Sequence, residues 1–141
     1  MREGPERPLA GVNDLALRAQ RAPNVHGALE AGFARDWAPA VHQAKDAGLV
    51  LVLDEPLDGV EGPLGRTLIY VGTTLPEAAR HHAAVVLPSA NMAEEEGTFR
   101  NLRGRVQRYF QANTPPGMAR PADWILREIL AALGVGAGAA A

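Results

Sequence analysis

Three stretches decide the fold: Leu49-Val50-Leu51-Val52-Leu53, Thr67-Leu68-Ile69-Tyr70-Val71 and Ala83-Ala84-Val85-Val86-Leu87. Each is a short apolar run without the alternation of polar and apolar residues that marks a strand with one wet face. Such runs are typical of strands buried on both faces of a parallel sheet. We therefore expect Leu51, Val85 and Leu87 to be core residues of adjacent strands.

Short helices are predicted between and after these strands. One begins at Asp36 and ends at Gly48, and a second over residues 75–82 begins with the capping-box spacing of Thr74 and Glu77. A last helix begins near Pro121 and carries one apolar stripe, formed by Ile125, Leu126, Ile129, Leu130 and Leu133. Strands that alternate with helices predict an α/β fold with a parallel sheet and right-handed crossovers.

The remaining segments complete the domain plan. Residues 1–12 are rich in Pro, Gly and charge and predict a flexible lead-in, and residues 135–141 predict a disordered Gly/Ala tail. Between them, residues 13–134 are expected to form a single α/β domain. Its first part would hold a short helix over residues 13–22 and an ordered loop or turn over residues 24–32.

Composition excludes several classes of function. The 141 residues hold 14 Lys+Arg against 16 Asp+Glu, a formal net charge of −2, which argues against a nucleic-acid binder with a basic face. The sequence has no cysteine, so it has neither thiolate ligands for an iron–sulfur cluster nor a cysteine nucleophile. It also contains no apolar run of the ~20 residues that a membrane span needs. We expect a cytoplasmic domain without direct membrane insertion.

Polar residues follow the predicted strands at the edge where ligands bind in open parallel sheets. They are Asp54, Glu55, Gly72, Thr73, Thr74 and Ser89. A phosphate cradle is normally Gly-rich with open backbone N–H groups, but no G-x-G-x-x-G or G-x-x-x-x-G-K-[ST] occurs here. Two carboxylates in the first loop would repel a phosphate, so any cofactor binding at this edge would be vestigial.

Other chemistry-bearing residues have simpler explanations. His81 and His82, with His42, lack the i, i+4 spacing of a helical zinc motif, so no metal site is expected. The acidic run Glu94-Glu95-Glu96 is typical of a solvated surface, and the arginines 100, 103, 105 and 108 favour ion pairs with it over an anion clamp. No catalytic residue is predicted.

One region resembles a known family. Residues 83–88 (AAVVLP) precede Glu94, then Gly97-Thr98-Phe99-Arg100-Asn101, then Gly104-Arg105-Val106-Gln107. This order resembles the molybdopterin oxidoreductase superfamily, with its strand ending in A-D-V-V-L-P, its E-x-x-G-T-F-x-N turn and its G-R-V-Q. Within the superfamily it is most similar to the family of the large iron–sulfur subunit of NADH-quinone oxidoreductase (respiratory complex I). Residues 24–32 resemble that family's N-x-x-G-A-x-x-x-G segment.

The resemblance implies a three-layer, parallel-sheet (Rossmann-like) α/β domain of the molybdopterin oxidoreductase / formate dehydrogenase type. It also implies a structural role without a redox centre of its own. Cofactor-binding relatives carry a G-x-N-P loop after the first strand, near the guanosine end of molybdopterin guanine dinucleotide. Here the loop reads Leu53-Asp54-Glu55-Pro56. The family's iron–sulfur clusters lie in a cysteine-rich N-terminal part that this sequence lacks, so the chain would be a fragment or one piece of a split subunit.

The implied partners are the iron–sulfur portion of that large subunit and neighbouring peripheral-arm subunits of complex I, which would place the chain at the periphery of the inner membrane. Two alternatives stay open: a pterin-dinucleotide-binding domain of an active molybdopterin oxidoreductase such as a formate dehydrogenase, and a free-standing small-ligand binding module.

The resemblance also groups a set of motif residues with a structural role: Pro88, Glu94, Gly97, Thr98, Asn101, Arg105 and Gln107. We expect Glu94 to accept hydrogen bonds from the turn of Gly97 and Thr98 and to pair with Arg105, and we expect Asn101 to bridge backbone groups.

Overall fold

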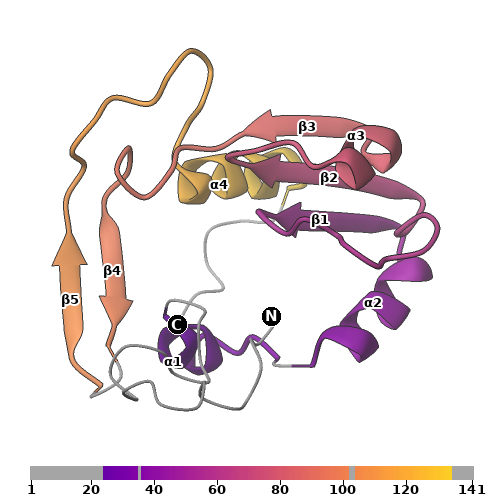
Figure 1. Ribbon diagram of the computed structural model, residues 1–141, viewed down its shortest axis with the longest axis horizontal. Coiled ribbons are helices and arrows are strands. Elements are labelled where there is room, and N and C mark those ends of the chain that lie inside the picture. The colour runs from indigo at the N-terminus through magenta and orange to yellow at the C-terminus, as the bar shows by residue number, and fades with distance from the viewer. Residues whose placement is uncertain (1–23, 35, 102–103, 135–141) are drawn as a thin grey trace, which may run out of the picture. The chain divides into compact units, whose positions relative to one another are not determined.

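The computed structural model describes residues 24–34, 36–101 and 104–134, which fall into two compact units. One contains helix α1 (Val25–Glu30) and the strands β4 (Gly97–Arg100) and β5 (Val106–Tyr109). The other contains β1 (Leu49–Leu53), β2 (Thr67–Gly72), α3 (Glu77–His82), β3 (Val85–Pro88) and α4 (Ala122–Ala132), all labelled in Figure 1. The division falls within α2 (Trp37–Lys45). The predicted lead-in, the helix over 13–22 and the tail lie outside the described residues, so the single-domain plan stays a prediction.

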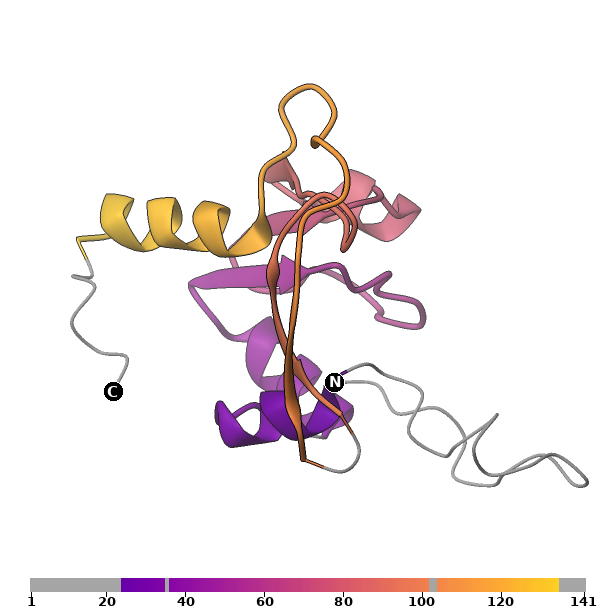
Figure 2. The same ribbon diagram turned by 90° about the vertical axis from the view of Figure 1, so that its left-hand side faces the viewer.

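The larger unit is built on a parallel three-stranded sheet in the order β1-β2-β3. Leu51 pairs with Ile69 of β2, and Ile69 pairs in turn with Val85 of β3. Helices α3 and α4 lie on opposite sides of this sheet, as the two views together show (Figures 1 and 2). The prediction of an α/β fold with a parallel sheet is therefore confirmed.

The core lies on β2 rather than evenly across the three strands. Leu68, Tyr70 and Val71 of this strand are 3%, 1% and 0% exposed. Leu51 and Val85 are 37% and 43% exposed, so the prediction that they are core residues is wrong. Only β2 has a neighbouring strand on both sides, whereas the flanking strands each pair with it alone and not with each other.

Helix α3 begins later than the capping-box spacing predicts. Pro76 is the N-cap residue in an extended conformation, and no side chain caps the helix. Glu77 is therefore the first helical residue and not the third, so its carboxylate cannot reach back to close a capping box. It bonds to His81 Nε2 instead, at 2.9 Å.

The smaller unit contains two elements that the sequence did not predict. Residues 24–32, expected as a loop or turn, include helix α1. Asn24 is the N-cap residue of this helix and has a left-handed φ of 57°. The polar segment after Ser89 supplies the antiparallel pair of β4 and β5, in which Phe99 lies opposite Gln107. Across the residues that the structure describes, none of the helices has the length and hydropathy to cross a bilayer.

Candidate functional site

The carboxyl edge of the parallel sheet is organised by Asp54. This residue follows β1 directly, and its backbone N–H donates to the Val71 carbonyl at 2.9 Å. Its φ of 49° is left-handed, a conformation that aspartate tolerates better than most residues. The turn directs the carboxylate to Thr73, whose backbone N–H and hydroxyl both donate to Asp54 Oδ1, at 2.8 and 3.1 Å. The loops after β1 and β2 are thereby tied together.

Gly72 leaves the space that this arrangement needs. A Cβ at Gly72 would lie 2.6 Å from Tyr70 Cε1 and 2.9 Å from Asp54 Oδ1, closer than real Cβ contacts. Burial raises the pKa of the Tyr70 phenol, and the nearby charges of Asp54 and Glu55 raise it further. The edge therefore presents negative charge beside a neutral phenol, a poor environment for a phosphate.

The third strand contributes Ser89, which is 6% exposed. Its N–H donates to the Gly72 carbonyl at 3.0 Å. It also forms a parallel bridge with Arg120, whose carbonyl accepts the Ala90 N–H at 2.8 Å. The Arg120 guanidinium donates to the Ala119 carbonyl at 2.7 Å. The backbone of Ser89 thus links the end of β2 to the segment at Arg120.

Arg120 is a residue of this edge that the sequence reasoning missed. The available signal was its position directly before Pro121, because a residue before proline favours the extended conformation that a bridge requires. Thr74 is exposed, and Glu55 is half-buried with its Oε1 enclosed.

The motif residues between Ser89 and Gln107 are divided between the two units. Glu94 Oε2 accepts the Asn91 N–H at 3.0 Å. The carboxylate reaches back because Glu94 N–H also donates to the Asn91 carbonyl, which closes a local turn. Gly97 and Thr98 belong to the other unit, so the expected bond from their turn to Glu94 stays a prediction. Glu94 and Arg105 belong to different units, and their pairing stays a prediction.

Asn101 has the bridging role that the sequence predicts. Its Oδ1 accepts the Arg105 N–H at 3.0 Å, and its N–H donates to the Arg105 carbonyl at the same distance. Its Nδ2 also donates to Gln107 Oε1 at 3.3 Å. Asn101 and Gln107 therefore hold the two ends of the connection between β4 and β5.

The two sequence segments that carry the family resemblance meet within the smaller unit. Asn24 Oδ1 accepts the Arg100 N–H at 2.8 Å, and Arg100 Nη2 pairs with Glu30 Oε2 at the same distance. Arg100 was expected to pair with the acidic run at residues 94–96, and its partner on α1 replaces that interpretation. Gly97 is needed here as well, because a Cβ would lie 2.7 Å from the Tyr109 hydroxyl.

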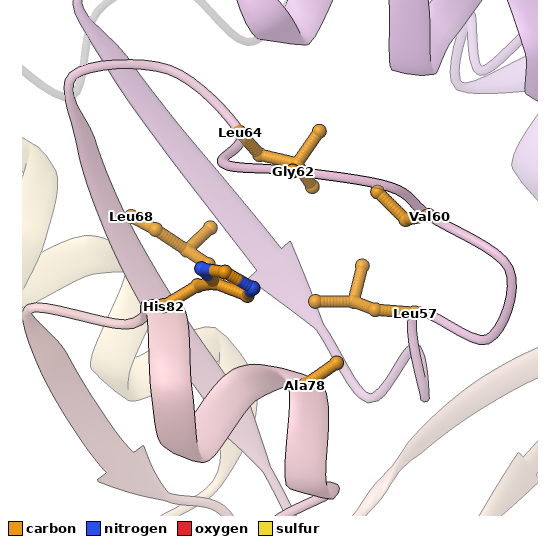
Figure 3. Close-up of a pocket in the computed structure, with 7 residues that line it drawn as sticks. All are labelled: Leu57, Val60, Gly62, Leu64, Leu68, Ala78 and His82. Atoms are coloured by element: carbon orange, nitrogen blue, oxygen red, sulfur yellow. The ribbon is translucent and has the colours of Figure 1, made fainter.

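A hollow lies on the α3 side of the sheet, under the loop between β1 and β2. Its lining is apolar apart from one histidine and comprises Leu57, Val60, Gly62, Leu64, Leu68, Ala78 and His82 (Figure 3). Leu57 and Leu64 are 3% and 5% exposed, which identifies the hollow as the packing of this loop against the sheet. Across the described residues, His, Asp and Glu side chains do not gather in a group that could hold a metal.

Comparison with known proteins relates this chain to several oxidoreductases. Residues 67–132, from β2 to the end of α4, match the family model of molybdopterin oxidoreductase. The chain is 40% identical over 80 residues to a nitrate reductase of Symbiobacterium thermophilum, covering 57% of this chain and 11% of that protein. A putative formate dehydrogenase of Bacillus subtilis is 45% identical over 53 residues, covering 38% of this chain and 5% of that protein.

The alignment with a third relative is longer. The mitochondrial NADH-ubiquinone oxidoreductase 78 kDa subunit of Neurospora crassa is 36% identical over 117 residues, which cover 82% of this chain and 15% of that subunit. The chain thus spans a small part of each of these relatives. Residues 67–132 are thus similar to the molybdopterin oxidoreductase domain, and the parallel sheet that begins this segment fits the match.

Proposed function

We propose that the chain is a structural domain of the large iron–sulfur subunit of an NADH-quinone oxidoreductase, without a redox centre of its own. The length of the alignments supports this interpretation. Similarity to the NADH-ubiquinone oxidoreductase 78 kDa subunit extends over 82% of the chain, against 38% for the Bacillus subtilis formate dehydrogenase. The segment around Asn24, which the resemblance assigns to the family of that large subunit, is joined to β4 by a side-chain hydrogen bond.

The observation that carries the proposal is the Asp54 carboxylate. In a nucleotide site of a parallel sheet, backbone N–H groups in the loops after the strands remain open to the phosphates. Here the Thr73 N–H donates to Asp54 Oδ1 at 2.8 Å, so a protein carboxylate takes a donor that a phosphate would use. The edge therefore does not fit the dinucleotide part of a pterin cofactor: a phosphate would have to displace Asp54 and then approach its negative charge.

Guanosine diphosphate is a suitable probe, because it carries the guanosine and phosphate groups of the dinucleotide end. We expect isothermal titration calorimetry to detect no binding to the wild-type chain. Asp54→Asn removes the charge and keeps the side-chain size, and it is the matched test of whether charge is the obstacle. Stoichiometric micromolar binding by the wild-type chain would contradict the proposal.

Two of the relatives keep the alternative function in view, a pterin-dinucleotide-binding domain of an active oxidoreductase. The nitrate reductase and formate dehydrogenase matches, at 40% and 45% identity, favour it, and Thr74 and Ser89 supply hydroxyls at the same edge. The two functions differ in the expected effect of Asp54. If the edge binds a dinucleotide, wild-type binding should be measurable, and Asp54→Asn should change its affinity.

The proposed function also implies partners. As a domain of such a subunit, the chain would contact the cluster-bearing portion of the same protein and neighbouring subunits of the peripheral arm. We expect it to be recovered with those proteins, in a complex at the periphery of the inner membrane, when a tagged copy is purified under native conditions. Recovery of the tagged chain alone would contradict this assignment of partners.

A further inference from the structure

The loop between β1 and β2, residues 54–65, concentrates left-handed backbone. Of the non-glycine residues that the structure describes, three have a positive φ, and two of them, Asp54 at 49° and Leu57 at 63°, lie in this loop. At its other left-handed positions the loop has glycine, which adopts this conformation without steric cost: Gly59, Gly62 and Gly65. A leucine there is strained, and such strain persists only where the surrounding structure enforces it.

Burial of the Leu57 side chain supplies that restraint. The side chain is 3% exposed and lines the hollow together with Ala78 and His82 of α3 (Figure 3). Leu64, near the other end of the loop, lines the same hollow and is 5% exposed. The Val60 N–H donates to the Leu57 carbonyl at 3.1 Å, a bond that stays within the loop. The two leucines therefore fasten the loop to the sheet against a backbone that favours release.

The same loop carries the contact that organises the carboxyl edge. Asp54 lies three residues before Leu57, and its Oδ1 accepts the Thr73 N–H at 2.8 Å. Glu55 and Pro56 separate the two left-handed residues. Proline fixes its own φ near −65° and restricts the residue before it to extended conformations. A link as short and stiff as this transmits a movement of Leu57 to Asp54.

We propose that residues 54–65 form a strained strap with two states, in which Leu57 is the positioning residue for the Asp54 carboxylate. In the closed state Leu57 lies in the hollow and Asp54 accepts the Thr73 N–H. When Leu57 leaves the hollow, both left-handed residues relax and the Thr73 N–H is released with them. The inference adds a regulation of the carboxyl edge to the proposed function and rests on the same Asp54 contact.

Amide hydrogen exchange of the full chain, followed by nuclear magnetic resonance at several low urea concentrations, tests for the open state without any substitution. Opening of a strap exposes little surface, so exchange at Thr73 and Val60 should depend weakly on urea. The Ala84 N–H donates to the Leu68 carbonyl of β2 at 2.9 Å, and its exchange should depend steeply on urea. An equally steep dependence at all three amides would overturn the proposal, because the strap would then open only when the chain unfolds.

Leu57→Ala tests the positioning role. Loss of the buried side chain should speed exchange at Val60 and Thr73 together, by roughly tenfold or more. Ile125→Ala is the control, since Ile125 is the buried residue of α4, across the sheet from the hollow, and its loss weakens the fold without touching the strap. It should speed exchange at Ala84 but not at Val60 or Thr73. Faster exchange at Val60 with an unchanged rate at Thr73 would overturn the proposal.

A comparison of glycine with alanine tests the strain. Glycine is the better residue at a left-handed position, so Leu57→Gly should exchange more slowly than Leu57→Ala at Val60 and Thr73. Leu64 is the matched site, because it is buried in the same hollow and its φ is not positive. There Leu64→Gly should exchange faster than Leu64→Ala. The same order at both sites would overturn the proposal, since the difference at residue 57 would then not come from its left-handed backbone.

These measurements contain no nucleotide, so their result is independent of the calorimetric test of the proposed function. An absent coupling between Leu57 and Thr73 overturns the strap and leaves the expected lack of guanosine diphosphate binding intact. Binding of guanosine diphosphate by the wild-type chain overturns the proposed function, and the exchange pattern then decides separately whether the strap opens.

Discussion

The central position of β2 predicts that two leucines one strand apart differ in their contribution to stability. Leu68 on β2 is 3% exposed, so Leu68→Ala should leave a cavity and lower the free energy of unfolding by about 2–5 kcal/mol. Leu51 on β1 is 37% exposed. The substitution there removes three carbon groups at about 0.8 kcal/mol each for full burial, which scales to about 1.5 kcal/mol at this exposure. No closed cavity forms at an open edge, so no further cost is added.

Urea unfolding followed by circular dichroism measures both values on one scale. The measurements should be made at two protein concentrations, so that any self-association of the chain does not enter the comparison. Leu68→Ala should lose clearly more stability than Leu51→Ala, with an unchanged dependence on urea. Equal losses, or a larger loss at Leu51, would refute the assignment of the core to β2.

Three further substitutions test the edge and the motif. Gly72→Ala should lower the free energy of unfolding by about 1–3 kcal/mol in urea, because its methyl group would overlap the Tyr70 ring, and an unchanged midpoint would contradict this contact. The folded chain raises the pKa of Tyr70, so it holds the neutral phenol more tightly than the unfolded chain does. This contribution to stability is complete below pH 10 and is lost as the pH rises through the raised pKa, so Tyr70→Phe should unfold less readily than wild type in an alkaline titration. Identical profiles would contradict this expectation. Glu94→Gln should cost about 1 kcal/mol of stability through a weakened bond to its turn, whereas Glu61→Gln at an exposed position should cost close to none. Equal effects would remove the reason for singling out Glu94.

The sequence predicts the parallel sheet well because its signals are local. Each strand is a short apolar run, Gly48 directly precedes β1, and Pro88 is the last residue of β3. The end of the last helix is equally local, since Gly134 adopts a left-handed φ of 71° after it. Such features need no knowledge of what lies on either face of the sheet.

The exposure of the outer strands could not be predicted in the same way. A run such as LVLVL is apolar at every position whether it lies in the middle of a sheet or at its edge. Its burial depends on how many strands the sheet contains and on what covers each face, which are properties of the tertiary structure. The same reasoning explains the missed strands β4 and β5, where Arg100, Gln107 and Arg108 make the segment polar. Antiparallel pairing and the Phe99–Tyr109 ring contact, with centroids 6.0 Å apart, stabilise these strands instead.

The candidate site was predictable in its position and its charge but not in its hydrogen bonds. The sequence places Asp54, Thr73 and Ser89 at one edge, because the ends of parallel strands meet there. That two carboxylates would repel a phosphate was also evident from the sequence. The decisive contact was not, because it depends on the left-handed turn of Asp54, which brings its carboxylate within 2.8 Å of the Thr73 N–H. A loop that binds its own carboxylate keeps its shape without a ligand. The same edge can therefore stabilise a domain with the structural role proposed above, and this proposal rests on the Asp54 carboxylate rather than on any missing glycine.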